Sequence, residues 1–123
     1  MQKVDWIIHA VFEYGPGGTK NNHTHGMERY GHLDFQMVLN APPQEISYLL
    51  NTTGMRVRDG EQFAPGDMVH GLYEDCGVRL DLFRETGRKV LRLIIPDSDN
   101  RFPEDPLCKE PYKYQILRMF EGE

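Results

Sequence analysis

Serine and cysteine are both scarce in this chain of 123 residues, and each occurs only twice. Neither Ser47 nor Ser98 stands in a Gly-x-Ser-x-Gly elbow, which argues against a serine hydrolase. Two cysteines, Cys76 and Cys108, are too few for a disulfide scaffold. No apolar run approaches the roughly 20 residues that a helix needs to span a bilayer, so we expect no membrane-spanning segment.

Positive charge is also in short supply. The chain has 14 basic and 19 acidic residues, which gives a formal net charge of −5. This balance disfavours broad contact with nucleic acid or with an anionic membrane, because both need a positive face. The first residues, Met1 to Trp6, do not combine a basic region with a long apolar stretch, as a signal peptide would. We therefore expect a cytoplasmic protein with free thiols.

The composition that remains is that of an ordinary globular protein. Hydrophobic residues make up 39% of the chain and charged residues 27%, and a length of this size is typical of one domain with one core. No repeat, low-complexity tract or linker interrupts the sequence. We expect residues 1–123 to form a single domain.

Apolar and β-branched residues predict strands in four places. These runs are Trp6–Tyr14, Leu33–Leu39, Val78–Leu82 and Val90–Ile95. Glycine and proline in Gly15–Gly18 predict a turn after the first run, and Glu85–Arg88 is typical of a hairpin connection before the last. Beyond the strands, three prolines predict an irregular chain as far as Tyr114–Phe120.

One helix is predicted in the middle of the chain. Pro42 and Pro43 suit its first turn, and apolar positions then follow at helical spacing from Ile46. Its end is expected at Gly54 or Gly60, depending on whether the helix continues past Met55. The resulting fold class is α+β, with a mainly antiparallel sheet and one principal helix packed on it. The predicted core consists of Trp6, Ile8, Phe35, Met37, Ile46, Leu49, Leu50, Leu80, Leu82, Leu91, Leu93 and Ile95.

Several motifs together resemble one known family. They are Thr24-His25-Gly26-Met27-Glu28-Arg29-Tyr30-Gly31-His32, the pair Pro42-Pro43, the stretch from Val57 to Asp67, Leu93-Ile94-Ile95-Pro96-Asp97 and Arg101-Phe102-Pro103. On these residues the chain resembles the bacterial "domain of unknown function 4262" family from about Tyr14 to Gln115. It departs from the family pattern at Asn40 and Ala41. The resemblance implies membership and brings no catalytic residue with it.

Three of the five histidines lie within ten positions of one another, at His23, His25 and His32. If the chain is extended there, His23 and His25 project from the same face, because side chains alternate along a strand. His32, Glu28 or Asp34 nearby could then complete three ligands on a divalent metal with one open position.

The alternative is structural. The same histidines could hydrogen-bond to the backbone or line the sheet face, with turns at Gly26 and Gly31. We expect structural or surface roles for His9 and His70, which are isolated in the sequence.

Two other groups of residues have a candidate role. Cys76 follows Glu74 and Asp75, and this negative charge disfavours a reactive thiolate.

Basic residues gather around the predicted hairpin, where a solvated strand face is the default and binding of an anion or acidic partner is the alternative. They are Arg84, Arg88, Lys89 and Arg92.

Three function classes follow from these observations. The first is a small binding or interaction module without its own catalytic machinery. The second is a metal-binding protein or metal-dependent enzyme that uses His23, His25 and His32, and the third is a structural accessory that acts through its surface. Localised chemistry is expected at the ligand-binding face of His23, His25, Glu28 and His32. Whether the partner is a protein or a small molecule, and whether the chain forms a homo-oligomer, stays open.

Overall fold

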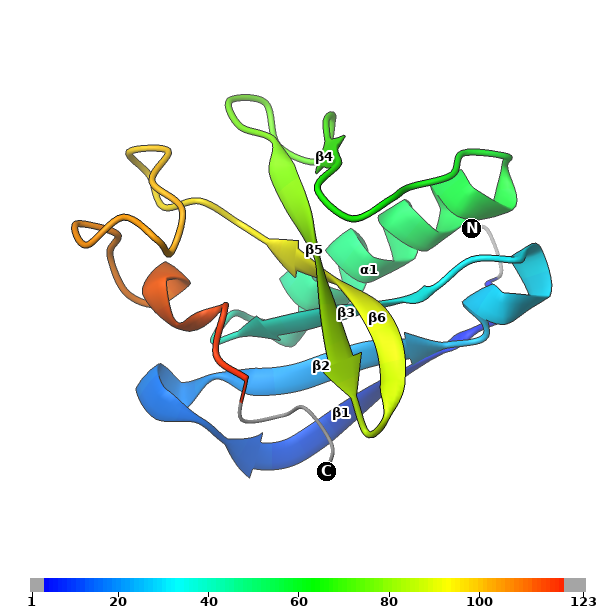
Figure 1. Ribbon diagram of the computed structural model, residues 1–123, viewed down its shortest axis with the longest axis horizontal. Helices are drawn as coiled ribbons and strands as arrows, with labels where there is room; N and C mark the ends of the chain where they lie inside the picture. Colours follow the sequence, from blue (N-terminus) through cyan, green and yellow to red (C-terminus); the bar gives the residue numbers. More distant parts are fainter. Residues whose placement is uncertain (1–3, 119–123) are drawn as a thin grey trace.

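The computed structural model describes residues 4–118, and of residues 12–14 it describes the backbone alone. Within residues 4–118 the chain forms six strands, one α-helix and three short 3₁₀ helices (Figure 1). They are β1 (Ile7–Tyr14), η1 (Pro16–Gly18), β2 (Lys20–His25), η2 (Met27–Tyr30), β3 (Asp34–Leu39), α1 (Pro43–Arg58), β4 (Met68–Val69), β5 (Val78–Glu85), β6 (Arg88–Ile94) and η3 (Tyr112–Tyr114). None of these helices has the length and apolar character needed to cross a membrane.

The six strands form one sheet in the order β1-β2-β3-β6-β5-β4. Every neighbouring pair is antiparallel except β3 and β6, which run parallel. That pair is joined through α1, β4 and β5, the kind of long crossover connection that parallel strands require. The predicted α+β fold with a mainly antiparallel sheet and one helix is therefore confirmed.

The helix α1 begins at the predicted proline entry and continues past the first of its two predicted ends. Pro43 occupies the first turn, and the helix ends at Arg58, with Gly54 inside it. Gly54 is buried because the ring of Trp6 lies against it. A Cβ at this position would be 2.7 Å from Cζ2 of Trp6, so the absence of a side chain permits the close approach.

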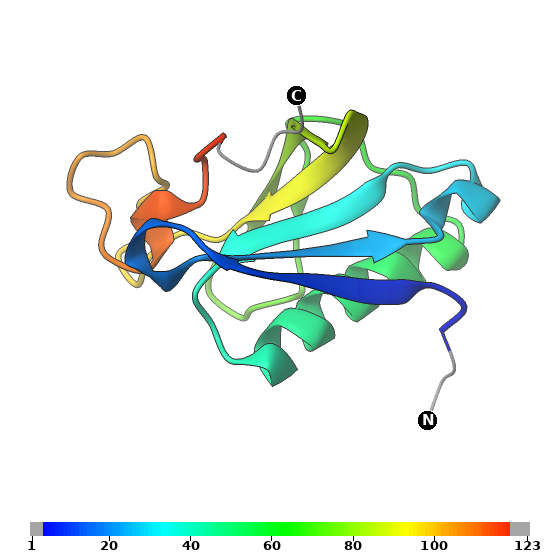
Figure 2. The ribbon, with the colours of Figure 1, turned by 90° about the horizontal axis from the view of Figure 1, so that it is seen from below.

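The two faces of the sheet are covered differently. Helix α1 lies along one face, and the carboxy-terminal segment, red in Figure 2, lies on the other side. On this second face a row of polar side chains crosses four neighbouring strands, because each residue is the register partner of the next. This polar row consists of His9, His23, Gln36 and Arg92.

Arg92 ties the polar row to the carboxy-terminal segment. Its Nη1 donates hydrogen bonds to the carbonyl oxygens of Gln115 at 3.0 Å and Leu117 at 2.5 Å. Its guanidinium also lies 3.5 Å from the centre of the Phe83 ring. The expectation of a solvated Arg92 is therefore wrong, since the side chain is fully buried between the sheet and this segment.

The predicted core is confirmed at ten positions. These are Trp6, Phe35, Met37, Ile46, Leu49, Leu50, Leu80, Leu91, Leu93 and Ile95, all buried. Ile8 is half-buried against the core, and the prediction for Leu82 is wrong because 42% of it is exposed. Helix α1 packs mainly against β3, η2 and β2, so it does not cover Leu82 on β5.

Between β6 and Arg118 the chain is irregular apart from the short helix η3, and an irregular chain was predicted as far as Tyr114. In the segment from Tyr114 to Phe120, Tyr114 ends η3 and a turn follows at Gln115 and Ile116, while Met119 and Phe120 lie outside the described part of the chain.

Candidate functional site

The hairpin of β1 and β2 brings three histidines together. His9 on β1 is the register partner of His23 on β2, and Ile7 is the partner of His25. Because His23 and His25 are two positions apart on a strand, they share a face, and His9 projects beside them. Ring centroids lie 4.9 Å apart for His9 and His23, 4.8 Å for His23 and His25, and 5.8 Å for His9 and His25.

These three residues form a cluster suited to a metal ion. One ring nitrogen from each can be chosen so that all three lie within 4.8 Å of one another. We call this group, His9, His23 and His25, the histidine triad. It is the one group of three or more histidine, cysteine or acidic side chains at such spacing within residues 4–118.

His23 is the buried member of the triad and has a fixed orientation. It is 2% exposed, and its Nδ1 lies 3.4 Å from Oδ1 of Asn21 and 3.5 Å from Oε1 of Glu85. Burial lowers the pKa of His23 to about 4, assisted by neighbouring positive charge and opposed by the Glu85 carboxylate. The ring is therefore neutral at pH 7. Since Nδ1 faces two acceptor oxygens, the proton belongs on Nδ1, which leaves the lone pair of Nε2 available.

The Glu85 carboxylate beside His23 is held by an arginine clamp. Burial opposes its ionisation, but the hydrogen bond from Arg88 and the positive charge of Arg88 hold the pKa of Glu85 below its usual value. Nε of Arg88 donates to Oε2 of Glu85 at 3.1 Å, and Nη1 donates to Oδ2 of Asp34 at 2.7 Å. Arg88 also donates to the carbonyl of Thr24 at 2.9 Å, so it joins the β5–β6 hairpin to β2 and β3.

The remaining predicted site residues lie beside the triad around a separate hollow. Glu28 is exposed on η2, between Gly26 and Gly31, whose φ angles are +130° and +69°. With His25 and His32 it borders a surface cavity of about 420 Å³. The structure therefore brings His25, Glu28 and His32 around one cavity.

The structure does not bring His32 to His23, because both ring nitrogens of His32 are engaged elsewhere. Its Nε2 accepts a hydrogen bond from the backbone N–H of Phe63 at 3.0 Å, and its Nδ1 lies 2.8 Å from the carbonyl oxygen of Leu33. The ring also packs at 5.2 Å from that of Phe35. His32 thus has the structural role that was the alternative for these histidines.

His9 is the residue that sequence reasoning missed. It was expected to be isolated, and it is instead the third member of the histidine triad. A signal for this was present in the sequence. The pairs Ile7–His25 and Ala10–Asn22 are both centred on Pro16, which lies in the predicted turn, so folding the chain at that turn places His9 opposite His23.

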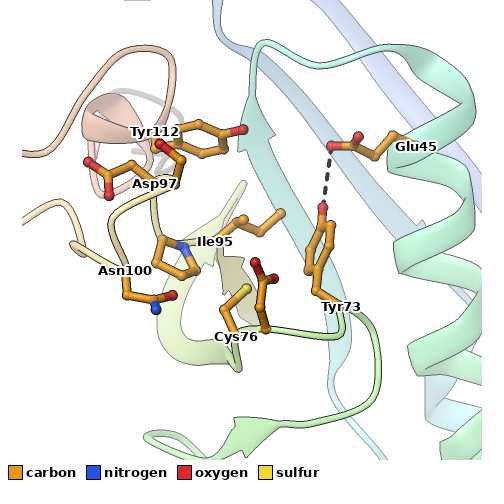
Figure 3. Close-up of a pocket in the computed structure, with 10 residues that line it drawn as sticks. Glu45, Tyr73, Cys76, Ile95, Asp97, Asn100 and Tyr112 are labelled. Atoms are coloured by element: carbon orange, nitrogen blue, oxygen red, sulfur yellow. Dashed lines mark hydrogen bonds between the residues drawn. The ribbon is translucent and has the colours of Figure 1, made fainter.

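A second cavity, of about 160 Å³, is drawn in Figure 3. Glu45, Tyr73 and Tyr112 contribute to its wall, and Tyr73 donates a hydrogen bond to Oε2 of Glu45 at 3.3 Å. Burial, followed by the charge of Glu45, raises the pKa of both phenols. Both phenols therefore stay protonated at neutral pH.

Cys76 and Asp97, two further groups of this cavity, are not activated either. Burial and the charge of Asp75 raise the pKa of the Cys76 thiol, as the flanking acidic residues predicted. Asp97 accepts hydrogen bonds from the backbone N–H groups of Asp99, Arg101 and Lys109, so its carboxylate closes a loop. Cys76 and Cys108 are both free, as expected. This cavity therefore shows no activated nucleophile.

Comparison with known proteins places the chain in one family. The search of curated proteins found no match, and the search of solved structures found none either. The family described as "Domain of unknown function (DUF4262)" matches residues 1–109, most of the chain. The histidine and proline motifs that suggested this assignment lie inside the matched range. The protein therefore belongs to the DUF4262 family.

Proposed function

We propose that this domain is a binding module whose ligand is a divalent transition-metal ion held by His9, His23 and His25. The observation that carries the proposal is the histidine triad itself, in which three imidazole nitrogens from two paired strands lie within 4.8 Å of one another. Relative to the sequence-based set, His9 takes the place of His32.

The donor atoms favour a transition metal over calcium or magnesium. Three imidazoles suit zinc, copper or nickel, whereas calcium and magnesium prefer oxygen ligands. The Glu85 carboxylate next to Nδ1 of His23 is the kind of outer partner that fixes the ring and increases the basicity of a metal-bound histidine. A neutral His23 has no proton to release before it binds.

The distances between the ring nitrogens of the triad are slightly longer than those between the ligands of a bound metal ion. Metal–nitrogen bonds of about 2.0–2.1 Å at a tetrahedral ion place ligand nitrogens about 3.4 Å apart, so the rings have to draw together slightly. His23 is fixed by Asn21 and Glu85, while His9 and His25 are exposed, so we expect these two rings to make the adjustment. Three protein ligands leave a position open for water or a further ligand, and we assign no reaction to it.

Metal titration of tag-free protein tests the proposal. We expect one Zn²⁺ or Co²⁺ ion per chain by calorimetry, with a tetrahedral Co²⁺ absorption spectrum. The His9→Ala and His25→Ala variants should each bind about tenfold or more weakly, since each loses a ligand. His70→Ala is the matched control, because His70 is an exposed histidine outside the triad and its loss should leave binding unchanged.

Two outcomes would contradict this assignment. Unchanged affinity in His9→Ala together with lost binding in His32→Gln would return the site to His23, His25 and His32. Absence of saturable binding in the wild-type protein for Zn²⁺, Co²⁺, Ni²⁺ and Cu²⁺ alike would reject a metal-binding function altogether.

A further inference from the structure

Four buried polar residues on the second face of the sheet form a continuous series of contacts. They are Arg92 on β6, Gln36 on β3, and Asn21 and His23 on β2. No more than 3% of any of these residues is exposed, so their polar atoms depend on one another. We call this series the amide chain, because two side-chain amides connect the arginine to the histidine.

Arg92 determines the direction of the amide chain, because a guanidinium has hydrogen-bond donors and no acceptor. Its Nε donates to Oε1 of Gln36 at 2.7 Å, so the nitrogen of the same amide has to point away from the arginine. Nε2 of Gln36 then donates to Oδ1 of Asn21 at 2.9 Å. Turning over either amide would place two donors against each other, which leaves one consistent arrangement.

The same oxygen of Asn21 faces His23. Oδ1 lies 3.4 Å from Nδ1 of the ring, and an acceptor at this point favours the tautomer with its proton on Nδ1. Glu85 acts in the same sense, since its Oε1 lies 3.5 Å from Nδ1 while Arg88 and Thr86 occupy its other oxygen. The tautomer of His23 is therefore constrained from two sides.

We infer that Gln36 is a positioning residue for the histidine triad, which holds the proton of His23 on Nδ1 and so presents Nε2 to a metal ion. Its role toward a metal rests on the proposed function, whereas the tautomer is a property of the metal-free protein. Gln36 is the register partner of both His23 and Arg92. It can therefore transmit the donor-only character of the arginine across the sheet without being a ligand itself.

The Gln36→Glu variant should reverse part of the amide chain while keeping its size. A glutamate beside Arg92 is ionised, so both of its oxygens accept, and Asn21 has to turn its amide nitrogen toward it. Nδ1 of His23 then faces a donor from Asn21 and an acceptor from Glu85. We expect a second tautomer, with the proton on Nε2, to become populated.

The matched control is Gln36→Met, which interrupts the amide chain without reversing it. Methionine neither donates to Asn21 nor accepts from it through a strong hydrogen bond. Asn21 is then not forced to turn, and Glu85 still accepts from Nδ1 of His23. This variant should lose stability, because Arg92 loses an acceptor, but it should keep the wild-type tautomer.

Long-range ¹H–¹⁵N NMR spectra of the histidine rings test the inference. They are recorded on metal-free protein at about pH 8, where an ordinary histidine is neutral. We expect the His23 proton on Nδ1 in the wild type and in Gln36→Met, and a clear share of it on Nε2 in Gln36→Glu. The exposed ring of His70 is the internal reference and should not change among the three proteins.

Zn²⁺ titration of the same proteins measures the effect on the metal site. Outer partners of a metal-bound histidine typically change affinity by about 10–100-fold. We expect binding to Gln36→Glu to be about tenfold weaker than to the wild type, and binding to Gln36→Met to be closer to the wild type. Absence of Zn²⁺ binding by the wild type would reject the proposed metal site, and with it the role of Gln36 toward a metal.

Four results would overturn the inference. They are a wild-type His23 with its proton on Nε2, an unchanged tautomer in folded Gln36→Glu, an equal change of tautomer in Gln36→Met, and wild-type Zn²⁺ affinity in a Gln36→Glu protein whose tautomer has changed. Amide spectra check that each variant folds. The wild-type measurement needs no variant, so the inference can fail even if Gln36→Glu does not fold. The tautomer spectra contain no metal, so their outcome is distinct from that of the metal titration.

Discussion

His9 and His23 face each other across the β1–β2 pair with their ring centroids 4.9 Å apart. His9 is exposed and His23 is buried, so the pair joins the surface of the sheet to its interior. From His23 the contacts continue inward, since Asn21 accepts a hydrogen bond from Gln36, and Gln36 accepts one from Arg92. A ligand on the histidine triad would thus rest on a hydrogen-bonded polar row.

Replacement of Gly54 in helix α1 by alanine should destabilise the protein. In an exposed helix interior this change stabilises by about 1 kcal/mol. Here the new methyl group would lie 2.7 Å from the ring of Trp6, which is held by a hydrogen bond to Asn51 at 2.9 Å. We expect Gly54→Ala to lower the free energy of unfolding by about 1–3 kcal/mol, as measured by urea denaturation.

A second variant isolates the cause of this loss. Trp6→Phe removes the ring atoms that approach Gly54, so in that background Gly54→Ala should be neutral or stabilising. If Gly54→Ala were equally destabilising with and without the tryptophan ring, the close contact would not be its cause.

His32 and His9 should differ in their effect on the stability of the metal-free protein. His32 accepts a backbone hydrogen bond from Phe63 and packs on Phe35. We expect His32→Ala to lower the free energy of unfolding by about 1–3 kcal/mol. His9→Ala, at an exposed edge position, should change it by no more than about 0.5 kcal/mol. Chemical denaturation with a chelator present compares them, and equal losses would argue against a structural role specific to His32.

Arg92 should be among the least replaceable residues of the sheet. Arg92→Met keeps the unbranched apolar stem of the side chain but removes the donor to the buried acceptor oxygens of Gln36 and Gln115 and to the half-buried carbonyl of Leu117. We expect a loss of about 3–5 kcal/mol in the free energy of unfolding. Arg84→Met is the control, because Arg84 is an exposed arginine of the same hairpin and should lose little. Similar losses in the two variants would contradict the structural role of Arg92.

The strands with apolar patterns were predictable from sequence, and β2 shows why other parts were not. Lys20–His25 contains no apolar side chain, so its hydrophobicity gives no strand signal. Four of its six residues are nevertheless buried. Ladder hydrogen bonds to β1 and β3 hold it in the sheet, and its buried polar atoms find partners such as Asp34, which accepts from Thr24 at 2.7 Å.

The candidate site was half predictable for a related reason. Period-two alternation places His23 and His25 on one face, and the structure has them there. The third member depends on the register of β1 against β2, which a bulge between Val11 and Tyr14 disturbs near the turn. The burial of Arg92 had a signal as well, because the continuous apolar run around it is typical of a strand covered on both faces.

His23 should make the metal-free protein less stable as the pH falls from about 6.5 to about 4. Burial lowers the pKa of His23 from 6.5 to about 4, so across this window the unfolded chain binds a proton that the folded chain does not. The contribution of neutral His23 to the free energy of unfolding is complete above a pH of about 6.5. It declines by at most about 1.4 kcal/mol per pH unit as the pH falls, and it is lost below a pH of about 4. Glu85, whose pKa is lowered from 4.5, acts only at lower pH. Urea denaturation at a series of pH values measures the slope. The His23→Gln variant should show a smaller slope of the free energy of unfolding against pH, in the window between about pH 4.5 and pH 6.5. An undiminished slope in this variant would assign the loss of stability to another group.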